Sequence, residues 1–449
     1  MTDINKSNGW SFPKEFWLAN FMELLERAAY YGFFIIITLY LTNIIGFTDI
    51  ETGIIAGIFG ALIYFFPPFA GAISDKIGFK NGLILAFVFL TVGYFFLGIF
   101  HSKFLVVVFL LIVVVGASFI KPLITGTVAK TTNAENKARG FSLFYWIVNI
   151  GAFGGKTVVP SIRQGIGLEY VNFFSAGMSF IALLFAIFIF KIDENRIEKS
   201  KSFSEILKSL KAILMTPRLI LLILIVSGFW LIQHQLYATM PKYVIRLLGE
   251  QAKPEWLANV NPLVVVLFVV FITQLFKKYK AVSVMLIGMI IMPFSALAMA
   301  SSQTLESITG NSINILGLFT MHPLTVMMII GIGIQGIAEC FISPRFLEYF
   351  ALQAPEGEEG TYMGFSHLHS FFSYLIGFFL SGFLLDAYCP DPSTLPIGIS
   401  EAEKMAIYAN AHVLWYYFVG IASIAAIALF IFRYVTNKID SSTENAAVN

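Results

Sequence analysis

Charged residues and cysteine are both scarce in this chain. Only 12% of its 449 residues are charged, 57% are hydrophobic, and it has two cysteines and a formal net charge of +2. So few charged residues cannot cover the surface of a soluble fold of this size. Two cysteines exclude a disulfide framework, and the sequence shows no phosphate-binding loop, nucleotide fingerprint or metal-ligand cluster. The composition therefore indicates an integral membrane protein and argues against an ATP-driven pump.

Long apolar runs recur along the whole chain. A helix of about 20 apolar residues crosses the hydrocarbon core of a bilayer, and twelve such runs are separated by charged or Gly/Pro-rich breaks. We expect an all-α protein with spans near 15–44, 53–74, 81–100, 103–129, 138–162, 171–191, 218–248, 257–277, 281–301, 318–352, 361–387 and 405–434.

The one long polar connection follows the sixth span, so the chain divides into two halves of six. We predict a cytoplasmic N-terminus (1–14), an N-terminal six-helix bundle (15–191), a cytoplasmic linker (192–217), a C-terminal six-helix bundle (218–434) and a cytoplasmic tail (435–449). Most lysines and arginines lie on the same side as both termini and the linker. Because positively charged short loops stay cytoplasmic, we expect this side to face the cytoplasm and the protein to lie in the plasma (inner) membrane. Within the linker, residues 203–214 are amphipathic, and either a simple connection or a helix lying on the inner leaflet fits them.

The first span carries an unusual concentration of charge. Glu23, Glu26 and Arg27 fall within five residues, followed by Tyr30 and Tyr31. A charged side chain at the bilayer centre costs about 2.5–3.5 kcal/mol on insertion scales, so these groups face protein, water or substrate rather than lipid. This segment is the strongest candidate for a functional site.

Several motifs resemble known transporter signatures. The turn at 71–80, Gly-Ala-Ile-Ser-Asp-Lys-Ile-Gly-Phe-Lys, resembles the loop that marks the major facilitator superfamily. The first-span motif Glu-x-x-Glu-Arg followed by Tyr-Tyr-Gly, the fifth-span run at 141–153, Lys121-Pro122 and Glu339-x-x-x-Ser343-Pro344 together resemble the proton-dependent oligopeptide transporters. The resemblance implies the major facilitator fold, with twelve transmembrane helices in two six-helix bundles.

The same resemblance implies roles for individual residues, and the chemistry of a short peptide agrees with them. A peptide is a zwitterion, so its site must offer cations at one end and a carboxylate at the other. By resemblance, Arg27 and Lys121 attract the carboxylate and Glu339 takes the ammonium. Other expected substrate contacts are Tyr30, Tyr31, Tyr64, Asn149, Trp230 and Asn261; expected gating residues are Asp75, Lys76, Lys121 and Glu339.

Proton coupling requires a carboxylate that gains and loses its proton during transport. Residues three and four apart on a helix are neighbours, so Glu26 and Arg27 both reach Glu23. We hypothesise that protonating one glutamate releases Arg27 for the substrate. The alternative is a structural ion pair that only locks the helix.

Three positions depart from the family pattern. His234 stands where relatives carry glutamate, and Phe34 stands where they carry a second arginine; those two positions form an ion pair in relatives. His234 fits either a titrating proton-coupling residue or a neutral gate residue. Lys156, two helical turns past Asn149, is expected at the cavity mouth as a substrate-binding cation, with snorkelling toward the outer headgroups as the alternative.

The sequence thus predicts a proton symporter that imports di- and tripeptides by alternating access, without a cofactor or metal. Its expected partners are short peptides, protons and lipid, with no nucleic acid, and we expect a monomer. A relative repurposed for another small zwitterionic or anionic solute is the alternative, because of Phe34, His234 and Lys156. A receptor is disfavoured because no sensory domain is appended, and an enzyme because no nucleophile and base recur together.

Overall fold

The computed structural model describes residues 12–132, 136–191, 202–353, 365–396 and 398–448, and nearly all of them are helical. The contacts between helices group the chain into two compact units. Unit 1 consists of Met1–Ile35 and Leu62–Leu207, and unit 2 of Ile36–Ala61 and Lys208–Asn449. The units therefore do not follow chain order, because residues 36–61 of the N-terminal half group with the C-terminal half. The predicted division into bundles 15–191 and 218–434 stays a prediction.

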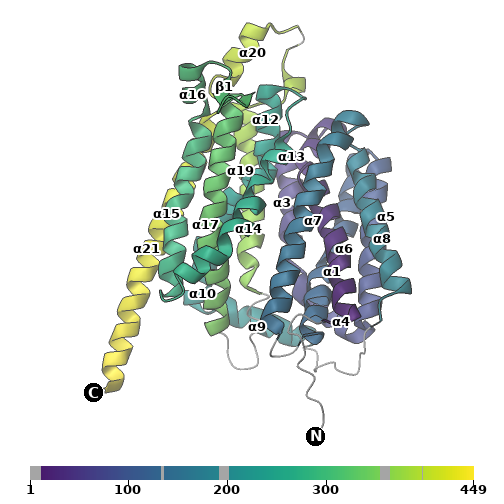
Figure 1. The fold of residues 1–449 in the computed structure, drawn as a ribbon, viewed down its shortest axis with the longest axis vertical. Helices are drawn as coiled ribbons and strands as arrows, with labels where there is room; N and C mark the ends of the chain where they lie inside the picture. The colour runs from purple at the N-terminus through teal and green to yellow at the C-terminus, as the bar shows by residue number, and fades with distance from the viewer. Residues whose placement is uncertain (1–11, 133–135, 192–201, 354–364, 397, 449) are drawn as a thin grey trace. The chain divides into compact units, whose positions relative to one another are not determined.

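Unit 1 is built from long apolar helices. They are α1 (Lys14–Phe34), α4 (Pro67–Ile77), α5 (Phe79–Ile99), α6 (Lys103–Lys130), α7 (Lys137–Gly165), α8 (Tyr170–Phe188) and the first part of α9 (Phe203–Leu214). Helix α1 packs against α7 and α8, and α5 packs against α6 and α8 (Figure 1). Gly78, at φ +86°, separates α4 from α5; this backbone conformation favours glycine and explains its place in the turn at 71–80.

Two glycines let α7 approach the charged motif of α1. A Cβ atom on Gly151 would lie 2.6 Å from the carbonyl oxygen of Leu24, and one on Gly155 would overlap the backbone of Ala28. Small residues at such crossings allow helices in membranes to pack backbone against backbone. The glycines of α7 therefore fix the helix that carries Glu23, Glu26 and Arg27.

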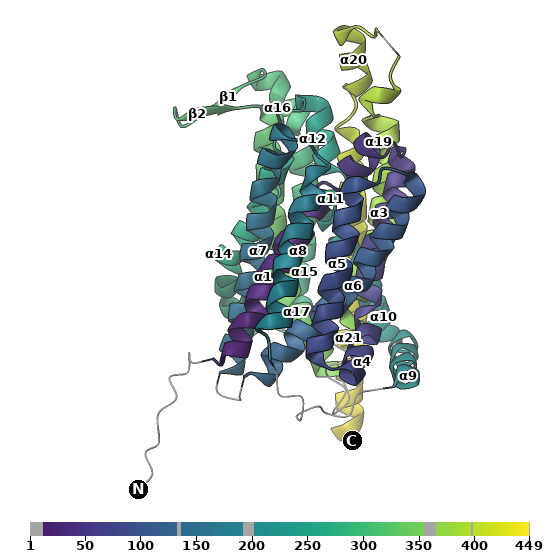
Figure 2. The same cartoon turned by 90° about the vertical axis from the view of Figure 1, so that its right-hand side faces the viewer.

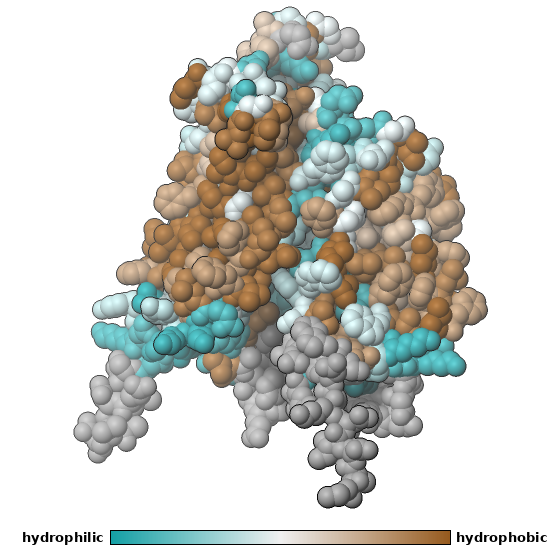
Figure 3. Space-filling view, viewed as in Figure 1, coloured by the Kyte–Doolittle hydropathy of each residue, from teal (hydrophilic) through white to brown (hydrophobic). Residues whose placement is uncertain are grey.

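Unit 2 contains the remaining elements. They are α2 (Ile37–Leu39), the π-helical turn η1 (Tyr40–Ile44), α3 (Asp49–Phe65, to Ala61), α10 (Pro217–Gln233), α11 (Gln235–Ala238), α12 (Met240–Leu248), α13 (Pro254–Leu257), α14 (Val260–Leu275), α15 (Ala281–Ala300), α16 (Ser302–Thr309), α17 (Pro323–Gln353), α19 (Leu368–Tyr388), η3 (Pro392–Thr394), α20 (Glu401–Tyr408) and α21 (Val413–Val448). Helix α15 packs between α17 and α21, and α10 packs against α19 and α21. Figure 3 shows a broad apolar surface over α14, α15 and α17, which suits a lipid-facing side.

The predicted membrane fold is confirmed. Nine helices in the described part of the chain are long and apolar enough to cross a membrane, and eleven if each of two bent pairs counts as one span. Helix α7 spans 29 residues but carries Lys156 and Arg163, so it is long enough to cross while being too polar for that test. Counting α7 makes the structure consistent with twelve spans.

Two element ends were predicted wrongly. The tenth span was expected from residue 318, but Phe319–Met321 forms strand β2, which pairs antiparallel with β1 (Ile313–Ile315) in register Ile313↔Met321. The twelfth was expected from residue 405, but a separate helix, α20, precedes α21. Helix α21 also continues through the predicted cytoplasmic tail. Short apolar strands beside a span cannot be distinguished from it by hydropathy alone.

Candidate functional site

The charged motif of α1 forms a buried cluster in unit 1. Glu23, Glu26 and Arg27 are at most 6% exposed. The Arg27 Nε atom donates to Glu26 Oε2 at 2.5 Å and lies 3.2 Å from Glu23 Oε1. One guanidinium therefore holds two carboxylates, which is the neighbour geometry that the spacing predicted.

Aromatic rings surround the guanidinium. Its Cζ atom lies 5.2 Å from the ring centre of Tyr30 and 5.9 Å from that of Tyr31. The resemblance implies that both tyrosines contact substrate, and in the structure their rings contact the cation. Tyr30 also stacks on Phe34, with ring centres 5.2 Å apart, so Phe34 replaces the expected second arginine with an apolar contact.

Two lysines of unit 1 lie against tyrosine rings. Lys121 Nζ lies 4.1 Å from the ring centre of Tyr64, and Lys156 Nζ lies 5.7 Å from that of Tyr31. Lys156 is only 1% exposed, which disfavours the snorkelling alternative. Asn149 donates to the backbone oxygen of Tyr145 at 2.8 Å, one turn back on its own helix. The cations of the predicted site are therefore on helices α1, α6 and α7 of one unit.

The predicted ammonium acceptor lies in unit 2. Glu339 on α17 accepts hydrogen bonds at Oε2 from Asn261 at 3.1 Å and from Gln233 at 2.9 Å. The structure thus brings two predicted substrate-binding residues, Asn261 and Glu339, together. It adds Gln233, which sequence reasoning missed although it directly precedes His234. Two amide donors on one oxygen orient the carboxylate and stabilise its charge.

His234 lies in a buried aromatic cluster of the same unit. Its Nδ1 atom is hydrogen-bonded to Ser373 Oγ at 3.1 Å, and its ring stacks on Tyr374 with centres 3.7 Å apart. Trp230, one turn earlier, stacks on His369 at 5.2 Å. The described surroundings of His234 are thus a hydroxyl and aromatic rings. Its role in coupling stays a prediction.

The structure gives little information on the predicted gating residues of the turn at 71–80. Asp75 lies in α4, but its side chain is outside the part of the structure that is described, and Lys76 is exposed near the end of the same helix. Their predicted conformational role, like the pairing of Lys121 with Glu339, stays a prediction. No group of three or more His, Cys, Asp or Glu residues within the described ranges is arranged to hold a metal ion.

Sequence reasoning missed a second buried ionic cluster, in unit 2, which we call the outer cluster: Asp49, Lys242, Arg246 and Asp391. Lys242 Nζ donates to Asp49 Oδ1 at 2.5 Å, and Arg246 donates to both oxygens of Asp49 at 2.7 and 2.9 Å. Arg246 also donates to Asp391 at 3.2 Å and to the backbone oxygen of Cys389 at 2.5 Å. Asp49 is the first residue of α3 and is only 4% exposed, so it is a buried acid rather than a solvent-facing one.

The outer cluster attaches residues 36–61 to the rest of unit 2. Gly53, Gly57 and Gly60 on α3 also pack closely on α19, where a Cβ atom on Gly60 would lie 2.5 Å from the ring of Tyr374. A signal for the cluster was present in the sequence. Lys242 and Arg246 are four apart inside a predicted span, and two cations on one helix face at membrane depth require an acidic partner.

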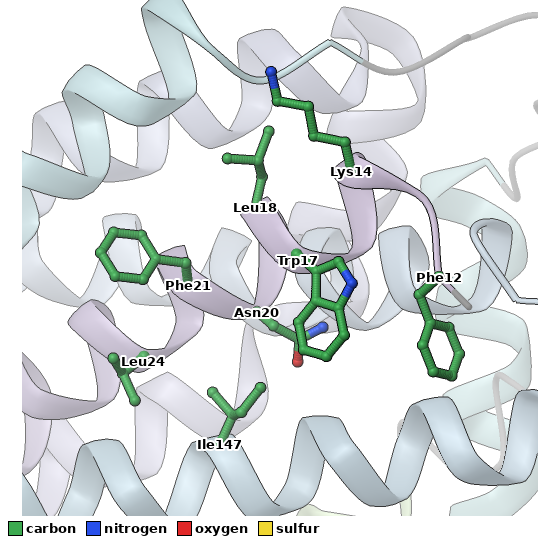
Figure 4. A pocket seen from close by; sticks show the side chains of 8 residues that line it. All are labelled: Phe12, Lys14, Trp17, Leu18, Asn20, Phe21, Leu24 and Ile147. Atoms are coloured by element: carbon green, nitrogen blue, oxygen red, sulfur yellow. The ribbon is translucent and has the colours of Figure 1, made fainter. Parts of the chain in front are cut away.

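An apolar pocket at the start of α1 is distinct from these clusters. It is lined by Phe12, Lys14, Trp17, Leu18, Asn20, Phe21, Leu24 and Ile147 (Figure 4). Lys14 is its only charged residue, so it lacks the opposite charges that a zwitterion needs. The charged residues Glu23, Glu26 and Arg27 of the same helix are buried and do not line this pocket.

Comparison with known sequences agrees with the motifs. A family model described as the Major Facilitator Superfamily matches residues 16–311. Dipeptide and tripeptide permease B of Aliivibrio fischeri (strain MJ11) is 32% identical over 189 residues, which are 41% of this chain and 38% of the permease. Dipeptide and tripeptide permease A of Edwardsiella piscicida is 27% identical over 236 residues, 51% of this chain and 47% of the permease. The matches thus span less than half the length of these relatives.

Solved structures share the fold over nearly the whole chain. A POT family transporter in complex with 5-aminolevulinic acid has a TM-score of 0.74 at 18% identity, covering 95% of this chain and 97% of its own. A peptide transporter POT in complex with sulfate has a TM-score of 0.73 at 17% identity, covering 95% of both chains. The predicted resemblance to the proton-dependent oligopeptide transporters is confirmed by these comparisons. Because the family model covers well over half of the sequence, the chain belongs to the Major Facilitator Superfamily.

Proposed function

We propose that this protein imports di- and tripeptides together with protons by alternating access. The observation that carries the proposal is that buried polar groups of opposite charge occur in the two units. Unit 1 presents Arg27, Lys121 and Lys156, whereas unit 2 presents Glu339 held by two amides. The peptide carboxylate binds the cations and its ammonium binds Glu339, because each end needs a partner of opposite charge. The names of the relatives support this substrate class.

Coupling to protons rests on the cluster of α1. Arg27 contacts both Glu23 and Glu26, so protonation of either glutamate weakens its hold on the guanidinium. The freed guanidinium then binds the substrate carboxylate. The gradient, rather than a cofactor, supplies the driving force. The lysine and arginine distribution predicts that the protein lies in a bacterial-type inner membrane with both termini in the cytoplasm.

Uptake into proteoliposomes tests the proposal. Labelled dialanine should accumulate with an inward proton gradient, stop accumulating when the gradient is collapsed, and be competed by other dipeptides. Dipeptide uptake that ignores the gradient would overturn proton coupling, and absence of dipeptide uptake would overturn the substrate class. In that case the third cation of unit 1, Lys156, which is buried, favours an anionic or other zwitterionic solute.

Variants of α1 test the coupling step itself. Glu23→Gln and Glu26→Gln should each abolish accumulation driven by the gradient while sparing exchange of labelled for unlabelled peptide. Glu15→Gln is the matched control, because Glu15 lies in the first turn of the same helix, away from Arg27. Accumulation retained by both Glu23→Gln and Glu26→Gln would leave the cluster as a structural ion pair.

A further inference from the structure

The connection between α15 and α17 exposes an unusual apolar surface. It contains α16 and the β1–β2 hairpin, and Ile308, Leu316, Leu318 and Phe319 are 77%, 89%, 77% and 51% exposed. Residues 307–321 carry no charged side chain. We call these four side chains the hairpin patch. An uncharged, apolar hairpin tip facing water would be unfavourable and prone to association.

Leu316 occupies a position in the turn of the hairpin that rarely carries leucine. Leu318 N donates to Ile315 O at 3.0 Å, and the two residues between them, Leu316 and Gly317, have φ values of +52° and +76°. Asparagine and glycine are preferred at such positions, and Leu316 is the one non-glycine residue with positive φ in the described ranges. Leucine thus occupies a position where its backbone is disfavoured and its side chain is almost fully exposed. A contact outside the chain explains why an apolar residue stands there.

The hairpin lies close to the outer ends of two apolar spans. Helix α15 ends at Ala300, and α17 begins at Pro323, two residues after β2. Strands of three residues are about 10 Å long, so the tip cannot extend far from these ends. In Figure 2 the hairpin extends sideways from α16, across the direction of α15 and α17.

The direction of the hairpin identifies the partner. The left side of Figure 2 is the side that faces the viewer in Figure 3, and the hairpin extends to that side, as α14 does. Figure 3 shows the apolar surface of α14, α15 and α17 on the same side. Helices α14 and α15 carry large exposed apolar side chains, among them Leu267, Ile290 and Phe294, each more than half exposed. The hairpin patch therefore continues a lipid-facing surface.

We propose that the hairpin patch is a membrane anchor that inserts into the outer leaflet, at the boundary between headgroups and acyl chains. Leucine and phenylalanine gain from burial at this depth, while the backbone of a short hairpin remains near polar headgroups. The inference is independent of the transported solute. It concerns the bilayer as a binding partner of the loop between α15 and α17.

Lipid quenching of a label at the tip tests the anchor. Leu316→Cys is labelled with an environment-sensitive fluorophore, and the full-length protein is reconstituted in vesicles that contain nitroxide lipids. Wild type labelled in parallel gives the background, because Cys340 and Cys389 are buried. A nitroxide at a shallow acyl position should quench the label at position 316 at least about twofold more strongly than it quenches the same label at Lys404→Cys. Lys404 is partly exposed on the charged helix α20, which Figure 1 shows beyond the hairpin in unit 2.

A second variant separates insertion from folding. With the label at Leu318→Cys, an added Leu316→Asn should reduce lipid quenching by about half or more, although asparagine suits the turn better than leucine. Equal quenching at positions 316 and 404 would overturn the anchor. Quenching that instead grows with protein density, without nitroxide lipid, would assign the hairpin patch to a second copy of the chain and also overturn it.

Discussion

Removing the acid at the centre of the outer cluster should release residues 36–61 from the rest of unit 2. Asp49 accepts hydrogen bonds from both Lys242 and Arg246, and all three are at most 9% exposed. In Asp49→Asn, two buried cations would share only Asp391. Breaking a buried ion pair by removing one partner costs about 3–5 kcal/mol. Since 1.4 kcal/mol is a factor of ten, the released state should gain about two to three and a half orders of magnitude in population.

The chain carries its own reporter of that release. Cys389 is fully buried, its carbonyl accepts from Arg246, and burial raises the pKa of its thiol to about 12. A thiol reacts with maleimide as the thiolate, so both burial and the raised pKa suppress alkylation near neutral pH. When the cluster opens, Cys389 gains solvent and its pKa falls toward about 8.5. The raised pKa thus protects the thiol at neutral pH, and this protection disappears as the pH rises toward 12.

The assay is the alkylation rate of Cys389 in a Cys340→Ser background at fixed neutral pH. Asp49→Asn should raise the rate at least about 100-fold, up to the limit set by a fully open state. Asp386→Asn, an exposed acid on α19 near Cys389, is the matched control and should leave the rate unchanged. Adding Lys242→Met to Asp49→Asn restores charge balance, because Arg246 keeps Asp391, and should return part of the protection. An Asp49→Asn rate within twofold of wild type would refute the reasoning.

Two further predictions concern the amide donors to Glu339 and the packing of α7 on α1. Gln233→Met removes one of the two amide donors to Glu339, and a hydrogen bond to a charged group contributes about 1.5–3 kcal/mol. The KM for dipeptide, measured from initial uptake rates, should therefore rise about 10- to 100-fold. An unchanged KM would mean that Gln233 does not orient the carboxylate. Gly155→Ala should force α7 away from the backbone of Ala28 and lower stability by about 1–3 kcal/mol, read as a thermal shift in detergent. Gly154→Ala is its control, since a Cβ atom there has nothing within 4 Å, and equal shifts for both variants would contradict the packing argument.

The sequence predicted the fold and the charged motif of α1 for a common reason. Both depend on local signals: apolar runs of span length, and neighbours three and four apart on one helix. The contact of Arg27 with Glu23 and Glu26 follows from that spacing alone. The contact of Asn261 with Glu339 could not follow from spacing, because 78 residues separate them.

The outer cluster and the hairpin could not be predicted in the same way. Asp49 and Lys242 are 193 residues apart, so their contact depends on helix packing rather than on spacing. Asp49 also lies at the end of a span, where an acid normally faces water. The predicted tenth span took in strand β2 because Leu318, Phe319 and Met321 are apolar, and hydropathy does not separate a strand from a helix end.

The outer cluster is ionic although it is almost fully buried, and this bears on alternating access. A buried ion pair is often no more stabilising than apolar residues of similar volume. A buried ion pair differs from an apolar contact because its charged partners regain hydration when they separate into water, whereas apolar side chains do not. The helix bends by 43° between α1 and the segment that contains α2 and η1, and by 45° between α3 and α4, so bends lie near both places where the chain passes between units. Residues 36–61 therefore combine bends at their ends with an attachment that can release.

This reasoning predicts the effect of making the attachment apolar. Asp49→Leu combined with Lys242→Met and Arg246→Met should raise thermal stability, since such replacements often stabilise by about 1–4 kcal/mol. The same variant should transport more slowly, because residues 36–61 no longer gain hydration when they separate from α12. Uptake and thermal unfolding measured on one preparation distinguish this from simple misfolding, which would lower both. A triple variant that is more stable and transports as fast as wild type would show that the outer cluster does not need to open during transport.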